Sequence, residues 1–477
     1  MVDQEFAMSG RVRTLAEHLR AGGWRTHAIV YKAALFGLGL EQGFDRWFNL
    51  PTSNRTAQVN LEKALAFLEA YHDRRFFLFL HLDDPHQPFN QPAPFDLSFG
   101  DSTAHDALDL ELPISIRNDR IIGCSQCMQS RRLLPGFVKV AQDLYDGAIA
   151  YTDDRIGVLL DALAKHGIYE DTVVAVVADH GELIYDRGRA WGHPGAGLTD
   201  DQIRVPLILK GARGDSFEPG ETVRAQVRTT DLLPTLLESA GLDGGPESFE
   251  SRSLWPLVSG EETRDRVAFI ESPAHGVLGL RTPAWKYVLR TRPSGQSHHS
   301  LYDLHSDPDE RDNVARQRPS EIARLAEEMA PFILRTRPGP FLLVLGDGEP
   351  GAFQLVLEKD DEVGYRSFIG LPPTSAPRAA DRDIAVSGRV LALIELDLAA
   401  GRAVRASLSS AGRTLISRVI TLDQLESYAK LDLDRLSRQP TPAIYFLRGA
   451  PPIDPFRTAA TTSLDQLEDL RALGYID

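Results

Sequence analysis

The chain has 477 residues, 43% of them hydrophobic and 25% charged, and carries a formal net charge of −15 with a pI of about 5.4. This composition is typical of a globular protein with about two or three domains. The strong acidity argues against a nucleic-acid-binding surface, and the sequence offers no run of roughly 20 apolar residues that could cross a membrane.

The pattern of apolar residues alternates between helices and strands from residue 14 to about residue 345. Strands separated by helices need crossover connections, so we expect an α/β fold with a mostly parallel sheet sandwiched by helices. The predicted elements are a helix over residues 14–23, a strand over 25–31, a helix over 57–72, a strand over 76–82, a helix over 144–166, and strands over 172–178 and 205–210.

Beyond about residue 337 the chain changes character, because apolar strand-like runs follow one another without long helices. These runs cover residues 341–345, 352–357, 390–396 and 413–420, and a short helix is expected over 464–473. We therefore predict an α/β domain over residues 1–336 and a smaller β-rich module over residues 337–477. The irregular segment 95–134 is expected to form a loop over the functional site.

The N-terminus and the cysteines bear on the cellular compartment of the protein. Residues 1–6 lack the basic and apolar regions of a secretory signal peptide, so the sequence as written predicts a cytoplasmic protein, and a missing upstream segment would allow a periplasmic or secreted one. Cys124 and Cys127 form a lone CxxC pair without partner ligands elsewhere, and we expect no functional role for them.

The strand over residues 172–178 is a continuous apolar run that stops at Asp179, His180 and Gly181. Such a run predicts a strand buried on both faces, and ligands of open α/β sheets bind beyond the carboxyl ends of the strands. A carboxylate beside an imidazole is a natural pair of metal ligands. The alternative is an ordinary polar turn, for which aspartate and glycine are common.

Two further histidines follow predicted strands. His86 lies between Pro85 and Pro88, which stiffen the loop after the strand over 76–82, so its imidazole is well placed to touch a ligand. The alternative is a loop histidine that packs on Phe89. His193 lies in a glycine-rich loop, which suits close approach to a ligand but is also typical of a plain connector.

Taken in order, these motifs resemble those of the sulfatases of the alkaline phosphatase superfamily. The resemblance rests on Pro85-His86-Gln87-Pro88, on the helix that begins at Tyr145, on Asp179-His180-Gly181-Glu182, on Trp191-Gly192-His193, and on the DPxExxN pattern from Asp307 to Asn313. It implies an alkaline phosphatase-like fold that hydrolyses small-molecule or glycan sulfate esters. It also implies a divalent metal, calcium foremost, with manganese, magnesium or zinc as alternatives.

The resemblance assigns roles to four residues. Asp179 and His180 would be metal ligands, while His86 and His193 would be catalytic residues that contact the oxyanion or anchor the substrate. Metal and cationic side chains in such a site neutralise the charge that shifts onto the leaving oxygen.

The sequence also departs from the family. Members begin with a strand that ends in paired aspartates and continue to a C/S-x-P-x-R motif that carries the nucleophile, and neither motif occurs here. Two protein ligands are too few for calcium, which takes about six to eight oxygens. We therefore expect the chain to be inactive as recorded, as a truncated hydrolase or a pseudoenzyme. The alternatives are a phosphodiester or phosphonate hydrolase, since the imidazole of His180 suits transition metals, and a non-catalytic binding protein on the sulfatase fold.

Overall fold

The protein is described from a computed structural model. The described residues are 6–8, 13–31, 39–49, 57–86, 89, 91–100, 135–184, 191–192, 197–214, 220–242, 251–272, 276–291, 297–336, 340–345, 351–359, 364–369, 380–386, 390–397, 403–410, 413–421, 426–427, 443–448 and 456–458.

The chain divides into two compact units. The first, here called the α/β unit, comprises residues 2–194, 199–264 and 454–477, and the second, here called the C-terminal unit, comprises Met1 and residues 195–198 and 265–453. The expected boundary between residues 336 and 337 lies inside the C-terminal unit, so a separately folding module over 337–477 stays a prediction.

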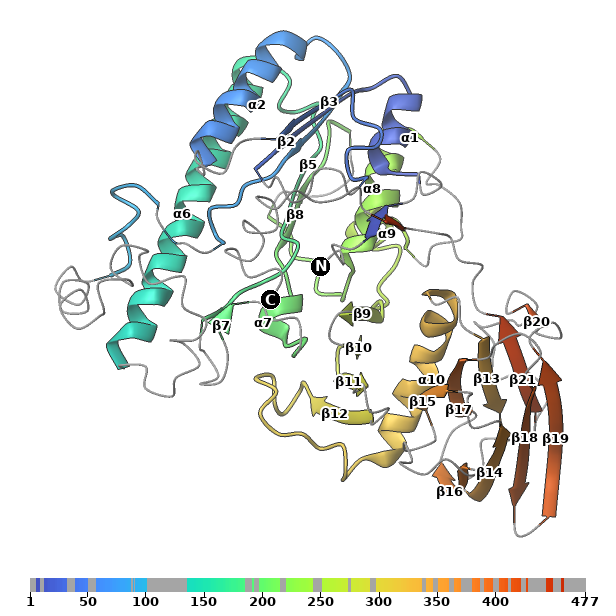
Figure 1. Ribbon diagram of the computed structural model, residues 1–477. Helices are drawn as coiled ribbons and strands as arrows, with labels where there is room; N and C mark the ends of the chain where they lie inside the picture. Colours follow the sequence, from blue (N-terminus) through green and yellow to red (C-terminus); the bar gives the residue numbers. More distant parts are fainter. Residues whose placement is uncertain are drawn as a thin grey trace. The chain divides into compact units, whose positions relative to one another are not determined.

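The α/β unit contains a parallel sheet covered by helices (Figure 1). Strand β2 (Arg25–Val30) pairs in parallel with β3 (Arg46–Asn49) on one side and with β4 (Phe76–Leu80) on the other. Helix α1 (Leu15–Ala21) precedes β2, and its start is fixed by a capping box between Thr14 and Glu17. The helices and strands predicted over residues 14–31 and 57–82 are confirmed here, and β3 is an additional strand that the apolar pattern does not predict.

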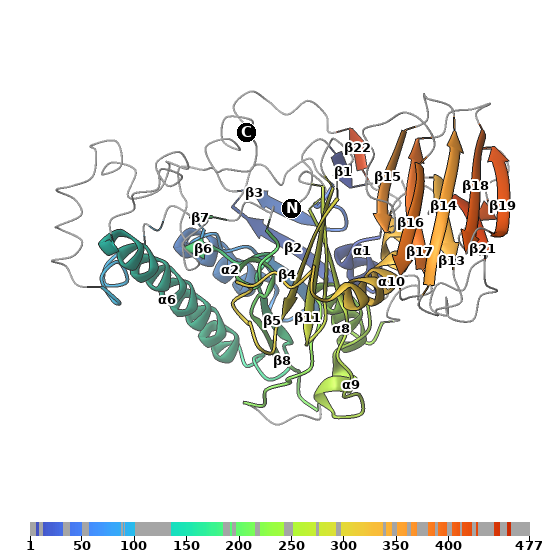
Figure 2. The ribbon, with the colours of Figure 1, turned by 90° about the horizontal axis from the view of Figure 1, so that it is seen from below.

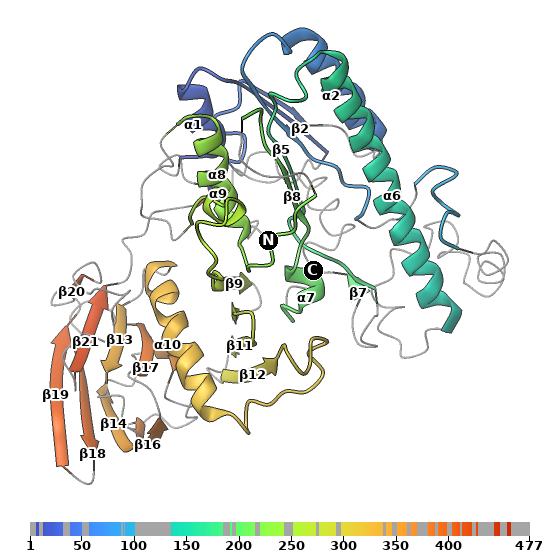
Figure 3. The same cartoon turned by 180° about the vertical axis from the view of Figure 1, so that it is seen from behind.

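Two long helices, α2 (Ala57–Tyr71) and α6 (Pro135–Lys165), lie side by side against these strands (Figures 1 and 3). Their carboxyl-terminal turns contribute Phe67, Leu68 and Leu163 to a core cluster, which also receives Phe76 at the start of β4 and Val174 at the start of β5. Leu159, Leu160 and Leu163 of the helix predicted over residues 144–166 therefore pack on this cluster, as amphipathic spacing requires, whereas Ile149 at the other end of that span is 44% exposed.

The strand over residues 172–178 forms β5 (Val174–Val177), which pairs antiparallel with β8 (Leu207–Lys210). A short hairpin joins β6 (Leu183–Ile184) to β7 (Trp191–Gly192), and β1 (Phe6–Met8) pairs antiparallel with β22 (Phe456–Thr458). The remaining elements of the unit are α7 (Asp200–Ile203), η3 (Thr229–Asp231), α8 (Leu232–Ser239) and α9 (Trp255–Val258).

A buried histidine on β2 supplies a first testable consequence. His27 is 3% exposed and packs against Phe67 and Tyr71, with ring centroids 4.6 and 5.1 Å away. Burial lowers the pKa of His27 below 6.5, helped by nearby Arg46 and Arg25 and opposed by Asp45. The unfolded chain therefore binds a proton at a higher pH than the folded chain, and folding stability falls as the pH drops below about 6.5.

We expect His27→Phe to remove this pH dependence, because phenylalanine fills the aromatic pocket without a titrating group. Urea denaturation at pH 7.5 and pH 5.5 measures it: wild type should lose stability relative to His27→Phe at the lower pH, by about 1.4 kcal/mol per unit of pKa shift. If the difference in free energy of unfolding between wild type and His27→Phe were the same at pH 7.5 and pH 5.5, the lowered pKa of His27 would be contradicted.

The C-terminal unit begins with an antiparallel sheet of order β12-β11-β10-β9. The expectation of alternating helices and strands is wrong for this stretch, because its strands follow one another through short links that permit only antiparallel neighbours. The elements are β9 (Ala268–Ser272), β10 (Val277–Arg281), β11 (Trp285–Thr291), β12 (Ser297–Asp303) and the helix α10 (Pro319–Thr336).

Helix α10 buries a row of residues at helical spacing, including Leu325, Met329 and Ile333, in one core with β10, β11 and β12. At the edge of this core a buried ion pair joins the ammonium of Lys286 on β11 to the carboxylate of Glu310. Their side chains are 2% and 1% exposed, so both charges are almost fully removed from water.

Two further sheets complete the unit, with orders β15-β17-β13-β21-β20 and β16-β14-β18-β19 (Figure 2). They confirm the β-rich character predicted for this region, and all their pairings are antiparallel except that of β20 with β21. The helix expected over 464–473 lies outside the described residues. The strands are β13 (Pro340–Leu345), β14 (Gly351–Lys359), β15 (Gly364–Ile369), β16 (Ala380–Val386), β17 (Val390–Asp397), β18 (Ala403–Ser410), β19 (Arg413–Thr421), β20 (Glu426–Ser427) and β21 (Ala443–Arg448).

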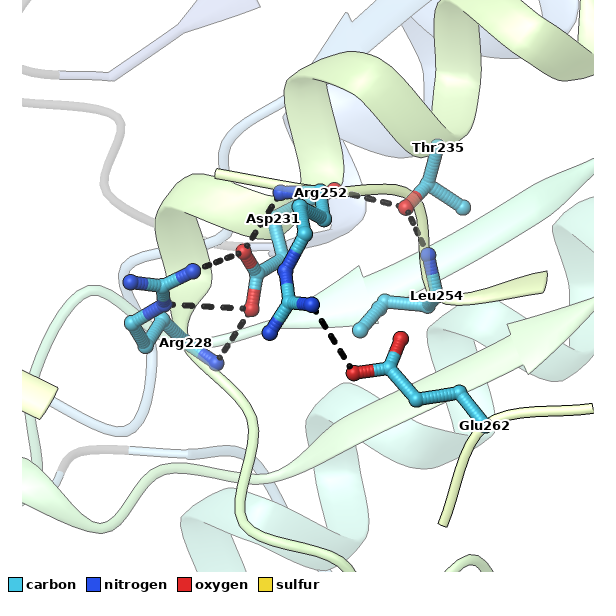
Figure 4. A network of polar contacts seen from close by, with 6 residues as sticks. All are labelled: Arg228, Asp231, Thr235, Arg252, Leu254 and Glu262. Carbon is cyan, nitrogen blue, oxygen red and sulfur yellow. Dashed lines mark hydrogen bonds and ion pairs between the residues drawn. The ribbon is translucent and has the colours of Figure 1, made fainter. Parts of the chain in front are cut away.

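A buried polar network joins η3 and α8 to the segment that precedes α9 (Figure 4). The carboxylate of Asp231 is fully buried and accepts hydrogen bonds from the backbone N–H and guanidinium of Arg228 and from the backbone N–H of Arg252. The hydroxyl of Thr235 accepts from the N–H of Leu254 at 2.9 Å. One carboxylate and one hydroxyl thus fix the path of the chain across some twenty residues.

Among the described residues, no helix is both long enough and apolar enough to span a membrane.

Candidate active site

The carboxyl ends of β4 and β5 lie at the same edge of the α/β unit. The first residues of both strands, Phe76 and Val174, join the cluster at the carboxyl-terminal ends of α2 and α6, so the two strands run in the same direction. The loops that follow them therefore emerge together at the opposite end of the helices. Asp179 and His180 follow β5, and His86 follows β4, so the topology brings these three predicted site residues to one edge.

Strand β5 is less buried than its apolar sequence predicts. Its first three residues are half-buried and Val177 is exposed, whereas a strand buried on both faces was expected. The physical reason is that, in the described part of the chain, β5 has β8 as its only hydrogen-bonded neighbour.

The side chains of Asp179 and His180 lie close enough to bind one cation. Nδ1 of His180 is 3.1 Å from the carbonyl oxygen of Gly181, and donation from Nδ1 leaves the lone pair on Nε2. Nε2 lies 3.7 Å from Oδ2 of Asp179. Two ligand atoms about 2.1–2.3 Å from one ion, at a near-tetrahedral angle, are roughly 3.4–3.8 Å apart.

Gly181 is required by a close backbone approach. Its N–H donates to the carbonyl oxygen of Gln202 at 2.8 Å, and a Cβ added at Gly181 would lie 1.9 Å from the carbonyl oxygen of Asp201. The turn after Asp179 and His180 is thereby docked against the end of α7, and Glu182 that follows is 9% exposed. A glycine at this position therefore admits the neighbouring backbone.

We expect Gly181→Ala to destabilise the α/β unit by about 1–3 kcal/mol, because the backbone of α7 must move to admit the methyl group. Gly157→Ala is the matched control: a Cβ at Gly157, inside α6, meets nothing within 4 Å. That substitution should stabilise the helix by about 0.5–1 kcal/mol. Urea denaturation of both variants tests the contrast, and equal effects would contradict the close approach.

The loop after β4 is anchored at several points. The N–H of His81 donates to the carbonyl oxygen of Ile29 at 3.0 Å, continuing the parallel pairing beyond β4, and the side-chain amide of Asn60 donates to the carbonyl oxygen of His81. The N–H of His86 closes a turn on the carbonyl oxygen of Asp83 at 3.0 Å. His86 is half-buried, and the loop that holds it is built on α2 and β2.

Phe89, three residues later, is 1% exposed and packs against Tyr145 of α6 with ring centroids 5.5 Å apart. The phenylalanine is thus a core anchor for the loop. The two roles predicted for His86, as a ligand contact or as a packed loop residue, stay predictions.

Two residues near the carboxyl end of β4 were not singled out from the sequence. Burial and, to a smaller degree, the charge of Asp84 raise the pKa of Tyr151, which places the phenol near the loop of His86. The guanidinium of Arg155 lies 5.5 Å from the ring centre of Tyr151 and donates to the side-chain oxygen of Gln58 at 2.5 Å. Their i, i+4 spacing on α6 could have indicated that they share a face.

The other predicted features lie outside the described residues. These are His193 and the lone cysteine pair Cys124 and Cys127, together with residues 101–134 of the segment expected to cover the site.

The described residues do not make a complete metal site. Among them, no group of three or more His, Cys, Asp and Glu side chains could hold an ion. Asp179 and His180 supply two ligand atoms, and calcium needs about six to eight. Their donor set, one carboxylate and one imidazole, suits a transition metal better than calcium but still requires ligands from elsewhere.

Two family models match the chain. Residues 9–242 match the model described as Sulfatase, and residues 197–336 match the model described as N-sulphoglucosamine sulphohydrolase, C-terminal. The second match ends at residue 336, next to the position beyond which strand-like runs follow one another without long helices.

Curated relatives are similar over part of their length. Arylsulfatase K of Xenopus laevis is 28% identical over 40% of this chain and 36% of its own length, and arylsulfatase K of Rattus norvegicus is 25% identical over 60% and 54%. Choline-sulfatase of Rhizobium meliloti is 29% identical over 37% of this chain and 34% of its own length. The chain thus spans about half, or less, of the length of these relatives.

Solved structures share the fold. The phosphonate monoester hydrolase of Agrobacterium radiobacter has a TM-score of 0.54 at 20% identity, covering 68% of this chain and 80% of its own. A protein determined in complex with its substrate D-glucosamine-2-N,6-O-disulfate has a TM-score of 0.52 at 19% identity, covering 69% of this chain and 84% of its own. With the matching family models and sulfatase relatives, these findings show that the chain belongs to the sulfatase and alkaline phosphatase superfamily.

Proposed function

We propose that the chain carries part of the active site of a metal-dependent hydrolase of small-molecule or glycan sulfate esters. The observation that carries this proposal is the pair Asp179 and His180, whose Oδ2 and Nε2 atoms lie 3.7 Å apart at the edge where His86 also emerges. The substrate class is supported by relatives whose names include arylsulfatase and choline-sulfatase, and by the glucosamine disulfate complex of a protein with the same fold.

In this proposal Asp179 and His180 are ligands of a divalent cation, while His86 and His193 contact the sulfate oxygens or the leaving oxygen. A sulfate monoester is an anion whose charge moves toward the leaving oxygen during hydrolysis, so cationic and hydrogen-bonding groups stabilise the transition state. The imidazole of His86 suits this task because it can donate a hydrogen bond when neutral and carries positive charge when protonated.

We further propose that the 477-residue chain is inactive by itself. The nucleophile motif C/S-x-P-x-R, and a strand with paired aspartates ahead of it, do not occur in the sequence, and the described ligand set is too small for the ion. We therefore assign no hydrolytic step to the residues present.

Equilibrium dialysis of radiolabelled inorganic sulfate against the purified chain tests the site without requiring turnover. We expect sulfate retention to need added Mn²⁺ and to fall at least tenfold in His86→Ala. Retention that is independent of the metal and unchanged in His86→Ala would contradict the proposal. Release of 4-nitrocatechol from its sulfate ester by the chain alone would contradict the proposed inactivity.

A second candidate is a phosphodiester or phosphonate hydrolase. It is favoured by the imidazole of His180, which prefers transition metals to calcium, and by the shared fold with a phosphonate monoester hydrolase. Replacing sulfate by methylphosphonate in the same dialysis distinguishes the sulfate ester hydrolase from the phosphodiester or phosphonate hydrolase. The anion that the chain retains better identifies the charge and shape that the site prefers. Retention of neither anion with any metal would favour a non-catalytic binding protein.

A further inference from the structure

We propose that a row of arginines at the amino-terminal ends of β2, β3 and β4 binds a sulfated glycan chain, at the edge of the α/β unit opposite the candidate active site. This arginine row consists of Arg20, Arg25, Arg46, Arg74 and Arg75. The choice of a sulfated ligand rests on the substrate class proposed above. The site itself rests on strand topology, exposure and charge.

The first observation is that three neighbouring parallel strands each start at an arginine or directly after one. Arg25 is the first residue of β2, Arg46 is the first residue of β3, and Arg75 immediately precedes β4. The strands lie side by side in the order β3-β2-β4 (Figure 2). Since neighbouring strands are about 4.8 Å apart, parallel pairing gathers three arginines that lie far apart in the sequence.

The second observation is a set of contacts that hold these arginines in one small area. The N–H of Arg25 donates to the carbonyl oxygen of Arg75 at 3.0 Å, and Arg46 is the register partner of His27 on β2. Burial is the main cause of the lowered pKa of His27, and the charges of Arg46 and Arg25 lower it further against the opposing charge of Asp45. Both guanidinium groups therefore lie near one imidazole.

The turn between α1 and β2 adds Arg20 to the row. The carbonyl oxygen of Arg20 accepts the N–H of Gly23 at 2.9 Å, and a Cβ added at Gly23 would lie 3.4 Å from Nη2 of Arg75. The guanidinium of Arg75 also lies over the ring of Trp24, 5.9 Å from its centre. The end of α1 and the start of β4 thus approach each other at the row.

The third observation is that the row carries positive charge in excess of its acidic partners. All five side chains belong to exposed residues. Arg25 lies 4.0 Å from Asp45 and Arg74 lies 3.8 Å from Asp73, and these arginines are 52% and 58% exposed, so both ion pairs are weak. The members that form no ion pair with any residue in the described part of the chain are Arg20, Arg46 and Arg75.

A locally positive surface can bind an anion although the whole chain carries a net charge of −15. At physiological ionic strength exposed charges are screened beyond about 8 Å, so a slender chain that lies on the row meets the arginines and little of the acidic surface. A nucleic-acid duplex is too wide for this. Single-stranded nucleic acids bind where aromatic faces are open for stacking, whereas Arg75 covers the ring of Trp24.

The residue type of the row suits sulfate groups. A guanidinium presents parallel N–H donors to two oxygens of one oxyanion, and every member of the row is an arginine. One exposed contact of this kind is weak, but several sulfates on one chain act together through their effective concentration. We therefore expect the row to bind a sulfated oligosaccharide and not to retain inorganic sulfate, so it does not interfere with the dialysis experiment proposed above.

The position of the row has a consequence for the candidate active site. The strands between the two edges are five or six residues long, so the row lies roughly 15–20 Å from the edge that carries His86, Asp179 and His180. A glycan held by the row leaves that edge open. The row would thus keep a polymer at the surface of the protein without blocking the candidate active site.

Fluorescence anisotropy of a fluorescein-labelled heparin octasaccharide, titrated with the full chain at low ionic strength in EDTA, tests the proposal. The double variant Arg46→Gln with Arg75→Gln should bind the probe at least about tenfold more weakly, because two charge-assisted contacts are lost. The matched control is Arg316→Gln with Arg318→Gln, which removes the same charge at exposed positions of the C-terminal unit. Its affinity should change by less than about twofold, since charges outside the contact are screened.

Two further arms distinguish the row from the candidate active site and from other ligands. The variant with Asp179→Asn and His180→Ala should bind the probe as tightly as wild type, because the row needs neither metal nor these side chains. The octasaccharide stripped of its sulfates should bind at least about tenfold more weakly than the sulfated probe.

Four results would overturn the proposal. They are no binding of the probe by wild type, equal loss in the row variant and the matched control, loss in the variant of Asp179 and His180, and binding of oligothymidylate or polyglutamate of equal charge as tight as that of the probe. Since these measurements contain no metal, their failure leaves the proposed function to be judged by dialysis with Mn²⁺, and the reverse holds too.

Discussion

Replacing Glu310 by alanine is expected to destabilise the C-terminal unit by about 3–5 kcal/mol, because the ammonium of Lys286 would remain buried without its carboxylate partner. The double substitution Lys286→Met with Glu310→Leu removes both charges and should recover most of this loss, since well-packed apolar residues replace buried ion pairs at little cost. Urea denaturation followed by circular dichroism measures both differences.

The matched control is the ion pair between Asp309 and Arg311, which is 3.1 Å long but has side chains 62% and 66% exposed. Asp309→Ala should change stability by less than about 1 kcal/mol, because water and salt screen exposed pairs. If Glu310→Ala were no more destabilising than Asp309→Ala, the ion pair would not be buried as described.

The second large effect is expected at Asp231. Its side chain is fully buried and holds the guanidinium and N–H of Arg228 and the N–H of Arg252. Asp231→Ala should cost about 3–5 kcal/mol, since it leaves a partly buried guanidinium and two backbone donors without their acceptor. Asp231→Asn should cost less, because the amide oxygen can still accept.

The nearby pair of Arg252 and Glu262 provides the comparison. Nη1 of Arg252 lies 3.3 Å from Oε1 of Glu262, with the arginine side chain 59% and the glutamate side chain 18% exposed, so water reaches the pair from the arginine side. Glu262→Gln should therefore change the free energy of unfolding by less than about 1 kcal/mol. If Glu262→Gln lowered the free energy of unfolding as much as Asp231→Ala, the burial of Asp231 would not explain how the network stabilises the fold.

The sequence predicts the elements of the α/β unit well because their signals are local. Helices α2 and α6 follow from apolar spacing, and β4 and β5 follow from short runs of branched and aromatic residues. The pairing partners of those strands could not be predicted, because an apolar run does not reveal how many neighbouring strands it pairs with. That is why β5 was expected to be buried on both faces and is instead half-buried beside β8.

The candidate site was predictable in part. Asp179 and His180 lie 3.7 Å apart, and the strands that precede them and His86 end at one edge. The sequence pattern indicates this edge because crossover helices make the strands parallel. The i, i+4 spacing of Tyr151 and Arg155 indicates that they share a face of α6, but their position near the loop after β4 depends on packing that no local pattern reveals. The antiparallel sheet β9 to β12 is not predictable for a similar reason, because its apolar runs do not reveal which strands pair.

The most direct test of the account is calorimetric titration of Mn²⁺ into the purified chain, compared with a variant that carries both Asp179→Asn and His180→Ala. We predict weak binding to the wild type, no tighter than about 10⁻⁴ M because two ligands are few, and no measurable binding to the variant. Equal binding to both proteins would contradict the assignment of Asp179 and His180 as part of a sulfatase-type metal site.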